Sequence, residues 1–239
     1  MACDYDKVDH VVTITLNRPK VLNAFNRDMH RELNESFVRF REDEDARVAI
    51  VTGSGERAFS SGQDLEELKT ILAEPEPLPD LWASYFGKDL PSGLDIWKPV
   101  IAAIRGYCIG EGLCLALACD FRIAGESATF SFPEVELGLP TIVGAIHASE
   151  LLGLGHALEL LLLGEKRGAE WAYRTGLVNL VVPDDEVSAK AGAWAEKLAG
   201  LDPAAVRATK EMARRSRGMS LPDAVRMGEA MRRVAVGRK

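Results

Sequence analysis

Two short turn segments, about fifty residues apart, constrain the fold of this 239-residue chain more than any other feature. One covers residues 59–65 (FSSGQDL) and the other covers residues 106–112 (GYCIGEG). Each joins an apolar run typical of a β-strand to the start of a helix. The first N–H groups of a helix lack partners inside it, so each turn presents free donors. Two such donors aimed at one point form an oxyanion hole, which stabilises negative charge on a carbonyl oxygen.

The composition is that of a globular protein with a sizeable core, since 47% of the residues are hydrophobic. No stretch reaches the roughly eighteen uncharged apolar residues that a membrane span needs. The first residues lack the charged-then-apolar order of a signal peptide, and we therefore expect a cytoplasmic protein without a membrane partner.

The cysteines and histidines argue against a metal centre. The four cysteines are Cys3, Cys108, Cys114 and Cys119, and none is in a CxxC spacing. The four histidines show no HExxH-like grouping. Buried thiols in a reducing compartment are therefore expected, without disulfides and without a bound metal.

The net charge of −7 argues against general nucleic-acid binding, but the charge is unevenly distributed. Residues 207–239 contain ten Lys or Arg and three Asp or Glu. Two interpretations stay open for this basic region. It forms a solvated helix face, or a few of its cations contact the phosphates of an anionic ligand.

Hydrophobic periodicity predicts strands mixed with helices first and helices last. We expect strands over residues 11–16, 48–51, 100–104, 121–124, 128–132 and 177–182. We expect helices over residues 26–40, 65–72, 113–119, 158–163, 184–199, 203–216 and 221–235. Asn26 and Asp64 are predicted N-caps, and Glu67 would complete a capping box with Asp64.

Five prolines punctuate residues 74–99, which predicts an irregular segment beside the active site with a short helix over residues 81–86. No low-complexity linker divides the chain. The pattern therefore favours one α/β unit that ends in helices.

Four motifs in order resemble those of the crotonase superfamily, the enoyl-CoA hydratases and isomerases. They cover residues 16–24 (LNRPKVLNA), 58–65, 101–120 and 132–138 (FPEVELG). The resemblance spans nearly the whole chain. It implies a crotonase-like β-β-α spiral core over residues 1–182 and a C-terminal helical trimerisation region over residues 183–239, in the same structural unit. It also implies a homotrimer or a dimer of trimers, an acyl-CoA substrate, and no cofactor besides the CoA of that substrate.

The resemblance also assigns residues by position. The backbone N–H groups of Gln63 and Glu111 would be the oxyanion donors. The residues expected near CoA are Lys20, Leu22, Arg57, Gln63, Asp64 and Leu65.

Glu134, in the FPEVELG motif, is the candidate general acid and base. A carboxyl group in a half-apolar pocket has a raised pKa, which suits proton exchange near neutral pH. Phe130, Phe132, Val135 and Leu137 are expected to supply that pocket. Glu136 would point the other way if the segment were extended.

Two positions depart from the family pattern. Glu111 stands where glycine is usual, and its side chain either narrows the pocket, joins the chemistry or faces solvent. Cys114 stands where hydratases commonly place a second glutamate, and we interpret it as a small buried apolar residue rather than a nucleophile. His147 either enters the pocket or makes a structural hydrogen bond.

With one carboxylate assigned, double-bond isomerisation of an enoyl-CoA is the simplest reaction, and hydration stays open. Another reaction of the superfamily, such as thioester hydrolysis, is a more distant alternative. A different class also stays open, which is a CoA-binding or scaffold protein that has lost catalysis.

Overall fold

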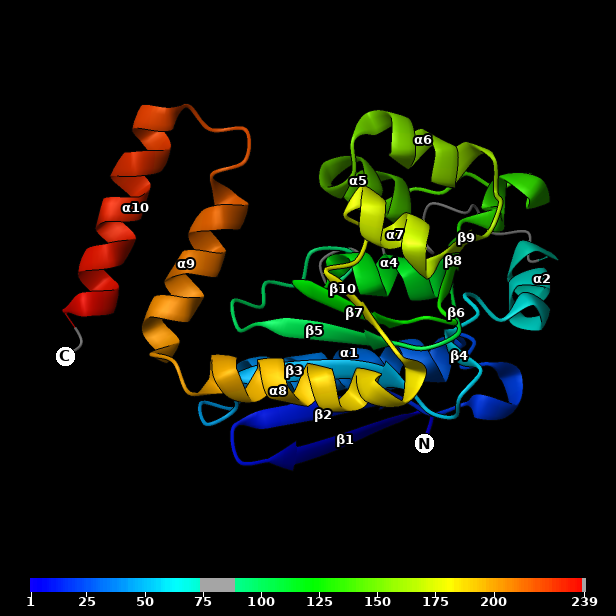
Figure 1. Cartoon of the computed structure of the whole chain (residues 1–239), viewed down its shortest axis with the longest axis horizontal. Helices are drawn as coiled ribbons and strands as arrows, with labels where there is room; N and C mark the ends of the chain where they lie inside the picture. Colours follow the sequence, from blue (N-terminus) through cyan, green and yellow to red (C-terminus); the bar gives the residue numbers. More distant parts are fainter. Residues whose placement is uncertain (74–88, 238–239) are drawn as a thin grey trace.

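The computed structural model describes residues 1–73 and 89–237 and contains two β-sheets with helices around them (Figure 1). The predicted helix over residues 81–86 lies outside the described residues, as does most of the predicted proline-rich segment. Residues 89–99 form turns and irregular backbone that lead into the next strand.

The larger sheet has six strands in the order β1-β2-β3-β5-β7-β10. Their bounds are Cys3–Val8, Val11–Leu16, Val48–Gly53, Val100–Ile104, Phe121–Gly125 and Leu180–Val182. The strands from β2 to β10 are parallel, and only β1 is antiparallel to its neighbour. The sequence analysis did not predict β1, because its charged residues leave only Cys3 fully buried and hide the alternation.

The smaller sheet has four short strands in the order β4-β6-β8-β9. Their bounds are Ala58–Ser60, Tyr107–Ile109, Thr129–Ser131 and Arg167–Gly168. The first three are parallel, and β9 is antiparallel to β8. Because each of these strands is only two or three residues long, period-2 patterns could not reveal them individually.

The two sheets are built from a repeated β-β-α unit. β3, β5 and β7 each add a strand to the larger sheet, and β4, β6 and β8, the next strand in each case, add one to the smaller sheet. Each unit then turns into a helical segment. The chain is therefore an α/β fold with the spiral of units that the sequence led us to expect.

The α-helices are α1 (Arg27–Glu42), α2 (Leu65–Ala73), α4 (Glu111–Ala118), α5 (Val143–Leu151), α6 (Leu154–Leu162), α7 (Ala169–Thr175), α8 (Val187–Ala199), α9 (Pro203–Arg215) and α10 (Leu221–Val236). Short 3-10 helices are η1 (Pro19–Val21), η2 (Pro133–Leu137) and η3 (Asp184–Glu186).

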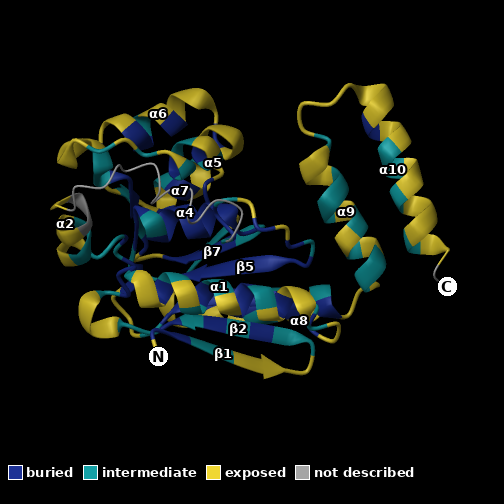
Figure 2. Cartoon of the chain, turned by 180° about the vertical axis from the view of Figure 1, so that it is seen from behind, coloured by how far each residue is buried: buried dark blue, intermediate teal, exposed yellow. Residues whose placement is uncertain are grey.

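Helices cover both faces of the larger sheet. α8 lies in front of it in Figure 1, and α1 lies in front in the reverse view of Figure 2. The α8 side packs small residues such as Ala191 and Ala195 against Ile50 and Ile101. The other side holds the main core, where α1 and α4 bury large apolar residues. α1 does so as its periodicity predicts, with Met29, Leu33, Phe37 and Phe40 all buried.

α9 and α10 stand to one side of the sheets (Figure 1). A groove of about 770 Å³ separates α9 from the body. Asp120 bridges it, since its carboxylate lies 2.6 Å from Lys210 Nζ and 3.1 Å from Arg214 Nη2. Within residues 1–73 and 89–237, no helix is long and apolar enough to cross a bilayer.

The caps agree with the sequence in two cases and differ in a third. Asn26 accepts a hydrogen bond from the Met29 N–H, as an N-cap does. Asp64 also acts as the predicted N-cap, since its Oδ1 accepts from the Glu66 N–H at 3.3 Å, but the prediction that Glu67 completes a capping box is wrong. The Glu67 carboxylate accepts from the Arg27 N–H instead, because the start of α1 lies beside α2 and offers an unpaired donor.

Candidate active site

Three candidate segments follow three neighbouring parallel strands. The turn with Gln63 follows β4, the turn with Glu111 follows β6, and Glu134 follows β8. The carboxyl ends of adjacent parallel strands lie at the same edge of a sheet. The smaller sheet therefore brings together segments that are separated by up to about seventy residues in sequence.

The first turn is held by the loop that precedes α1. The Ser61 N–H donates to Leu22 O at 2.9 Å, and the Phe25 N–H donates to Gly62 O at 2.8 Å. The Asp64 N–H donates back to Phe25 O at 2.8 Å. The Gly62 N–H donates to Ser60 Oγ at 3.1 Å, so the amides on both sides of Gln63 are paired. Among the described residues, the Gln63 N–H itself has no hydrogen-bond acceptor.

Asn23 stabilises this turn through hydrogen bonds, a role that the sequence analysis missed. The residue is fully buried in the left-handed conformation, with φ of 56°. Its Nδ2 donates to Ser54 O at 3.0 Å and to Ala58 O at 2.9 Å, and its carbonyl accepts from Ser60 Oγ at 2.8 Å. Asparagine tolerates this conformation better than most residues, which is the one signal that the sequence offered.

The second turn exposes the Glu111 amide. Gly110 adopts φ of 52° and ψ of −120°, a conformation suited to glycine, and its N–H donates to Ser131 O at 3.0 Å. Glu111 then begins α4, so its N–H has no partner within the helix. No other described residue accepts from it.

The two turns meet at Gly62. A Cβ atom added to Gly62 would lie 3.5 Å from the Glu111 nitrogen, so the first turn passes directly beside the second. The unpartnered amides of Gln63 and Glu111 therefore lie on adjoining turns at one edge of the smaller sheet. This arrangement can receive an oxygen atom that carries negative charge.

Glu134 lies against the second turn. A Cβ atom added to Gly110 would lie 2.9 Å from Glu134 Oε1, and the other carboxylate oxygen accepts from Thr141 Oγ1 at 3.1 Å. Burial raises the pKa of Glu134, and the Thr141 hydrogen bond opposes this rise in part.

Two details around Glu134 correct the sequence analysis. The segment is the 3-10 helix η2 rather than extended, and Glu136 lies against Gly164. Phe130 and Phe132 are buried as expected, but Val135 and Leu137 are exposed. Pro133 explains why the segment is helical rather than extended, because the fixed φ of proline favours the first turn of a helix.

The Glu111 side chain is half-buried, and it lies within range of the charge of Glu134. Burial raises its pKa to about 7, and the charges of Asp89 and Glu134 add to the rise. Asp89 was absent from our candidate residues. It sits at the start of the second described range, and no motif marked it.

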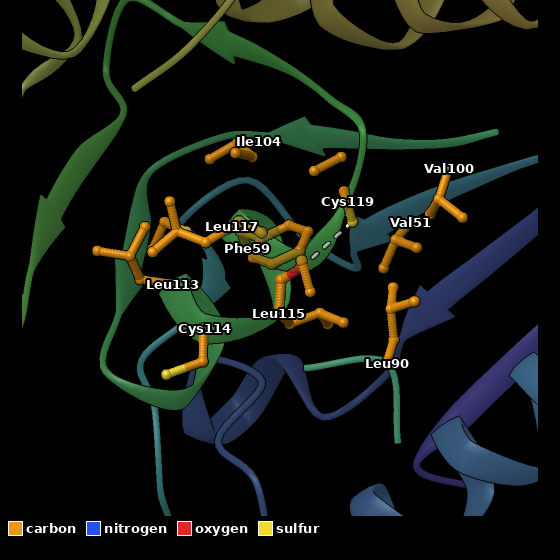
Figure 3. Packing of buried hydrophobic residues seen from close by; sticks show 14 of the residues in the cluster. Val51, Phe59, Leu90, Val100, Ile104, Leu113, Cys114, Leu115, Leu117 and Cys119 are labelled. Carbon is orange, nitrogen blue, oxygen red and sulfur yellow. Dashed lines mark hydrogen bonds between the residues drawn. The ribbon is translucent and has the colours of Figure 1, made fainter. Parts of the chain in front are cut away.

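Cys114 lies one helical turn after Glu111 and is 5% exposed. In Figure 3 its thiol points away from Phe59, whereas Leu115 of the same helix lies near that ring. Burial, together with the charges of Glu111 and Glu134, raises its pKa well above the usual value. A thiol in this environment stays protonated and is a poor nucleophile.

Of the two open roles for His147, the structure shows the hydrogen bond to the backbone. Its Nε2 lies 2.8 Å from Pro91 O and therefore donates to that carbonyl. A second histidine contacts a residue of the candidate oxyanion hole, since His30 Nε2 is 3.3 Å from the Gln63 side-chain oxygen. Burial lowers the pKa of His30 and favours its neutral form.

The residues expected near CoA lie on the two loops that meet at the first turn. Lys20, Arg57 and Leu65 are exposed, and the other three are half-buried. The Asp64 carboxylate is held by Arg18, with Oδ2 at 3.1 Å from both terminal nitrogens. Arg18 is a further supporting residue that the sequence analysis did not single out.

Comparison with known proteins identifies the family. The family model described as Enoyl-CoA hydratase/isomerase matches residues 6–235. The chain belongs to the enoyl-CoA hydratase/isomerase family. As a member of this crotonase family, it is an acyl-CoA enzyme with the crotonase fold.

Curated relatives and solved structures agree on the family. The chain is 38% identical to (E)-benzylidenesuccinyl-CoA hydratase of Thauera aromatica, over 89% of this chain and 82% of the relative. It is 39% identical to carnitinyl-CoA dehydratase of Salmonella typhi, over 90% of this chain and 81% of that relative. The crystal structure of an enoyl-CoA hydratase from Bacillus anthracis superimposes with a TM-score of 0.92 at 34% identity, over 100% of this chain and 92% of that one.

Proposed function

We propose that this enzyme stabilises the enolate of an acyl-CoA thioester with the amides of Gln63 and Glu111, while Glu134 moves a proton at the adjoining carbon. The observation that carries the proposal is the pair of unpartnered N–H groups on adjoining turns beside a carboxyl group of raised pKa. Removing one donor from an oxyanion hole typically costs about 3–4 kcal/mol of transition-state stabilisation.

Hydration or dehydration and double-bond isomerisation both pass through such an enolate. The names of the relatives favour the first, since two of them are a hydratase and a dehydratase. The CoA moiety would lie along the loops that carry Lys20, Leu22, Arg57 and residues 63–65. Lys20 and Arg57 place positive charge there that suits a phosphate.

The decisive test is exchange of the acyl α-hydrogen. Butyryl-CoA is incubated with the enzyme in D₂O, and deuterium at the α-carbon is followed by mass spectrometry. Exchange by the native enzyme that disappears in Glu134→Gln supports the proposal. Thermal stabilisation by butyryl-CoA without exchange would instead support the alternative of a CoA-binding protein that lacks catalysis.

A homotrimer or dimer of trimers, built through residues 183–239, stays a prediction for this chain. Light scattering of the native protein and of a chain that ends at residue 202 tests it. The prediction fails if the native protein elutes as a monomer.

A further inference from the structure

The Glu111 carboxyl group has no partner in the part of the chain that the structure describes. No hydrogen bond or ion pair reaches it, although it is half-buried at the first position of α4. Its amide is the candidate oxyanion donor, so its side chain begins at the point where a bound carbonyl would sit. A carboxyl group held there without a partner is available to a ligand.

The groups around Glu111 are acidic or neutral. The charges of Asp89 and Glu134 act on its carboxyl group, and Cys114 lies one turn along the same helix with its thiol protonated. The Asp89 carboxylate accepts hydrogen bonds from the Ser92 N–H, at 2.8 Å, and from the Ser92 hydroxyl. The nearby His30 is favoured in its neutral form. No Lys or Arg among the described residues forms an ion pair with Glu111 or Glu134.

We propose that the Glu111 carboxyl group is a second catalytic acid–base group that works with Glu134, and that the enzyme therefore adds or removes water rather than shifting a double bond. This inference rests on the proposed function, because it uses the same oxyanion hole. It assigns to the side chain at position 111 the proton transfer that Cys114, one turn later, cannot supply.

For hydration, the carboxyl groups of Glu111 and Glu134 need to carry one proton between them. Two carboxyl groups in one partly apolar site repel each other when both are ionised, so they tend to share one proton. The burial-raised pKa of Glu111, about 7, and the raised pKa of Glu134 fit this requirement near neutral pH.

The hydration step balances with these two groups. The step starts from the form in which the shared proton lies on Glu134. Ionised Glu111 takes a proton from water as the water oxygen bonds to the β-carbon of the enoyl thioester. The π electrons shift to the thioester oxygen, where the two amides stabilise the enolate, and protonated Glu134 then delivers its proton to the α-carbon. The proton on Glu111 passes to Glu134 and restores the pair. Dehydration is the same sequence in reverse.

Two substitutions test the role of the side chain at position 111 separately from the role of its backbone amide. Glu111→Gln keeps the shape of the side chain, and Glu111→Gly removes it, while both keep the N–H group. We expect both variants to lose hydration of crotonyl-CoA and cinnamoyl-CoA by about 100-fold or more, the usual size of a general acid–base contribution. Exchange of the butyryl-CoA α-hydrogen should fall much less, because it needs Glu134 and the amides.

Glu134→Gln is expected to lose both hydration and exchange. The matched control is Glu136→Gln, which changes a carboxyl group beside Gly164 and should keep both reactions. The kcat/KM profile of Glu111→Gln should also lack one ionisation that the native enzyme shows. Native exchange without hydration of either probe, or hydration at native rates in both Glu111 variants, would overturn the inference alone. Absence of exchange in the native enzyme would overturn the proposed function itself.

Discussion

The backbone of Gly110 passes so close to Glu134 that a Cβ atom at position 110 would lie 2.9 Å from Glu134 Oε1. The same glycine has positive φ, so any side chain there is also strained. Gly110→Ala is therefore expected to displace the carboxyl group and lower turnover by about 100-fold or more. Strain of this kind costs about 1–3 kcal/mol in unfolding free energy.

Steady-state kinetics and urea unfolding measure the two effects of Gly110→Ala. Gly192→Ala is the control, because a Cβ atom at Gly192 in the middle of α8 meets no atom within 4 Å. Alanine is a better helix former than glycine, so this control should keep activity and gain a little stability. Native turnover in Gly110→Ala would show that Glu134 is not constrained by this contact.

Thr141 is expected to set the pH range of the reaction. Its hydroxyl donates to Glu134 Oε2 at 3.1 Å, which stabilises the ionised carboxylate and lowers its pKa. Thr141→Val removes the donor with little change of shape, so the pKa of Glu134 should rise further. The corresponding limb of the kcat/KM profile then moves to higher pH, whereas Thr141→Ser should leave it in place.

Asn23→Ala should destabilise the fold and the first turn together. The substitution leaves Ala58 O and Ser54 O without the donor that they now share, and each unsatisfied buried group costs about 1–3 kcal/mol. We expect a loss of about 3 kcal/mol in urea unfolding. Asn34→Ala is the matched control, because Asn34 Oδ1 is buried without a partner within the described residues, and its replacement should be nearly neutral.

Asp120 is expected to hold α9 against the body. Its side chain is 13% exposed, and that of Lys210 is 12% exposed, so this ion pair is largely buried. Breaking a buried pair leaves an uncompensated charge, and Asp120→Asn should lower the unfolding free energy by about 3 kcal/mol. The solvent-exposed pair of Arg232 and Glu229 is the control, since Glu229→Gln should cost less than about 1 kcal/mol.

Glu111 also predicts how stability changes with pH. Its pKa rises from 4.5 to about 7 in the folded state, so folded protein binds this proton more tightly than unfolded protein does. The stabilisation is complete below pH 4.5 and is lost as pH rises through 7, a change of about 3 kcal/mol. Chemical unfolding of Glu111→Gln between these values should show a smaller decline with pH than native protein. An equal slope would mean that the carboxyl group is solvated.

The sequence predicted the long elements because their patterns are local. α1 has its N-cap at Asn26 and its apolar stripe at helical spacing, so both its start and its buried face were predictable. β1 was missed because it is held by pairing with β2 and not by its own hydrophobicity. The capping box failed for a related reason, since the donor that Glu67 found belongs to α1 and is remote in sequence.

The sequence predicted the central residues of the candidate site but not the residues that hold them in place. The motifs marked Gln63, Glu111 and Glu134, and the topology of the smaller sheet brings their segments together. Asp89, Asn23 and Arg18 act through contacts that only the folded chain creates. The orientation of the Glu111 side chain likewise depends on neighbours from other turns, so three interpretations stayed open at that position.

The candidate catalytic segments all follow strands of three residues, whereas the larger sheet has six strands of up to six residues. A short strand contributes few hydrogen bonds, so the edge that carries the candidate site can open locally while the rest of the molecule stays folded. Such a division leaves a lineage free to exchange one acyl-CoA reaction for another without rebuilding its framework.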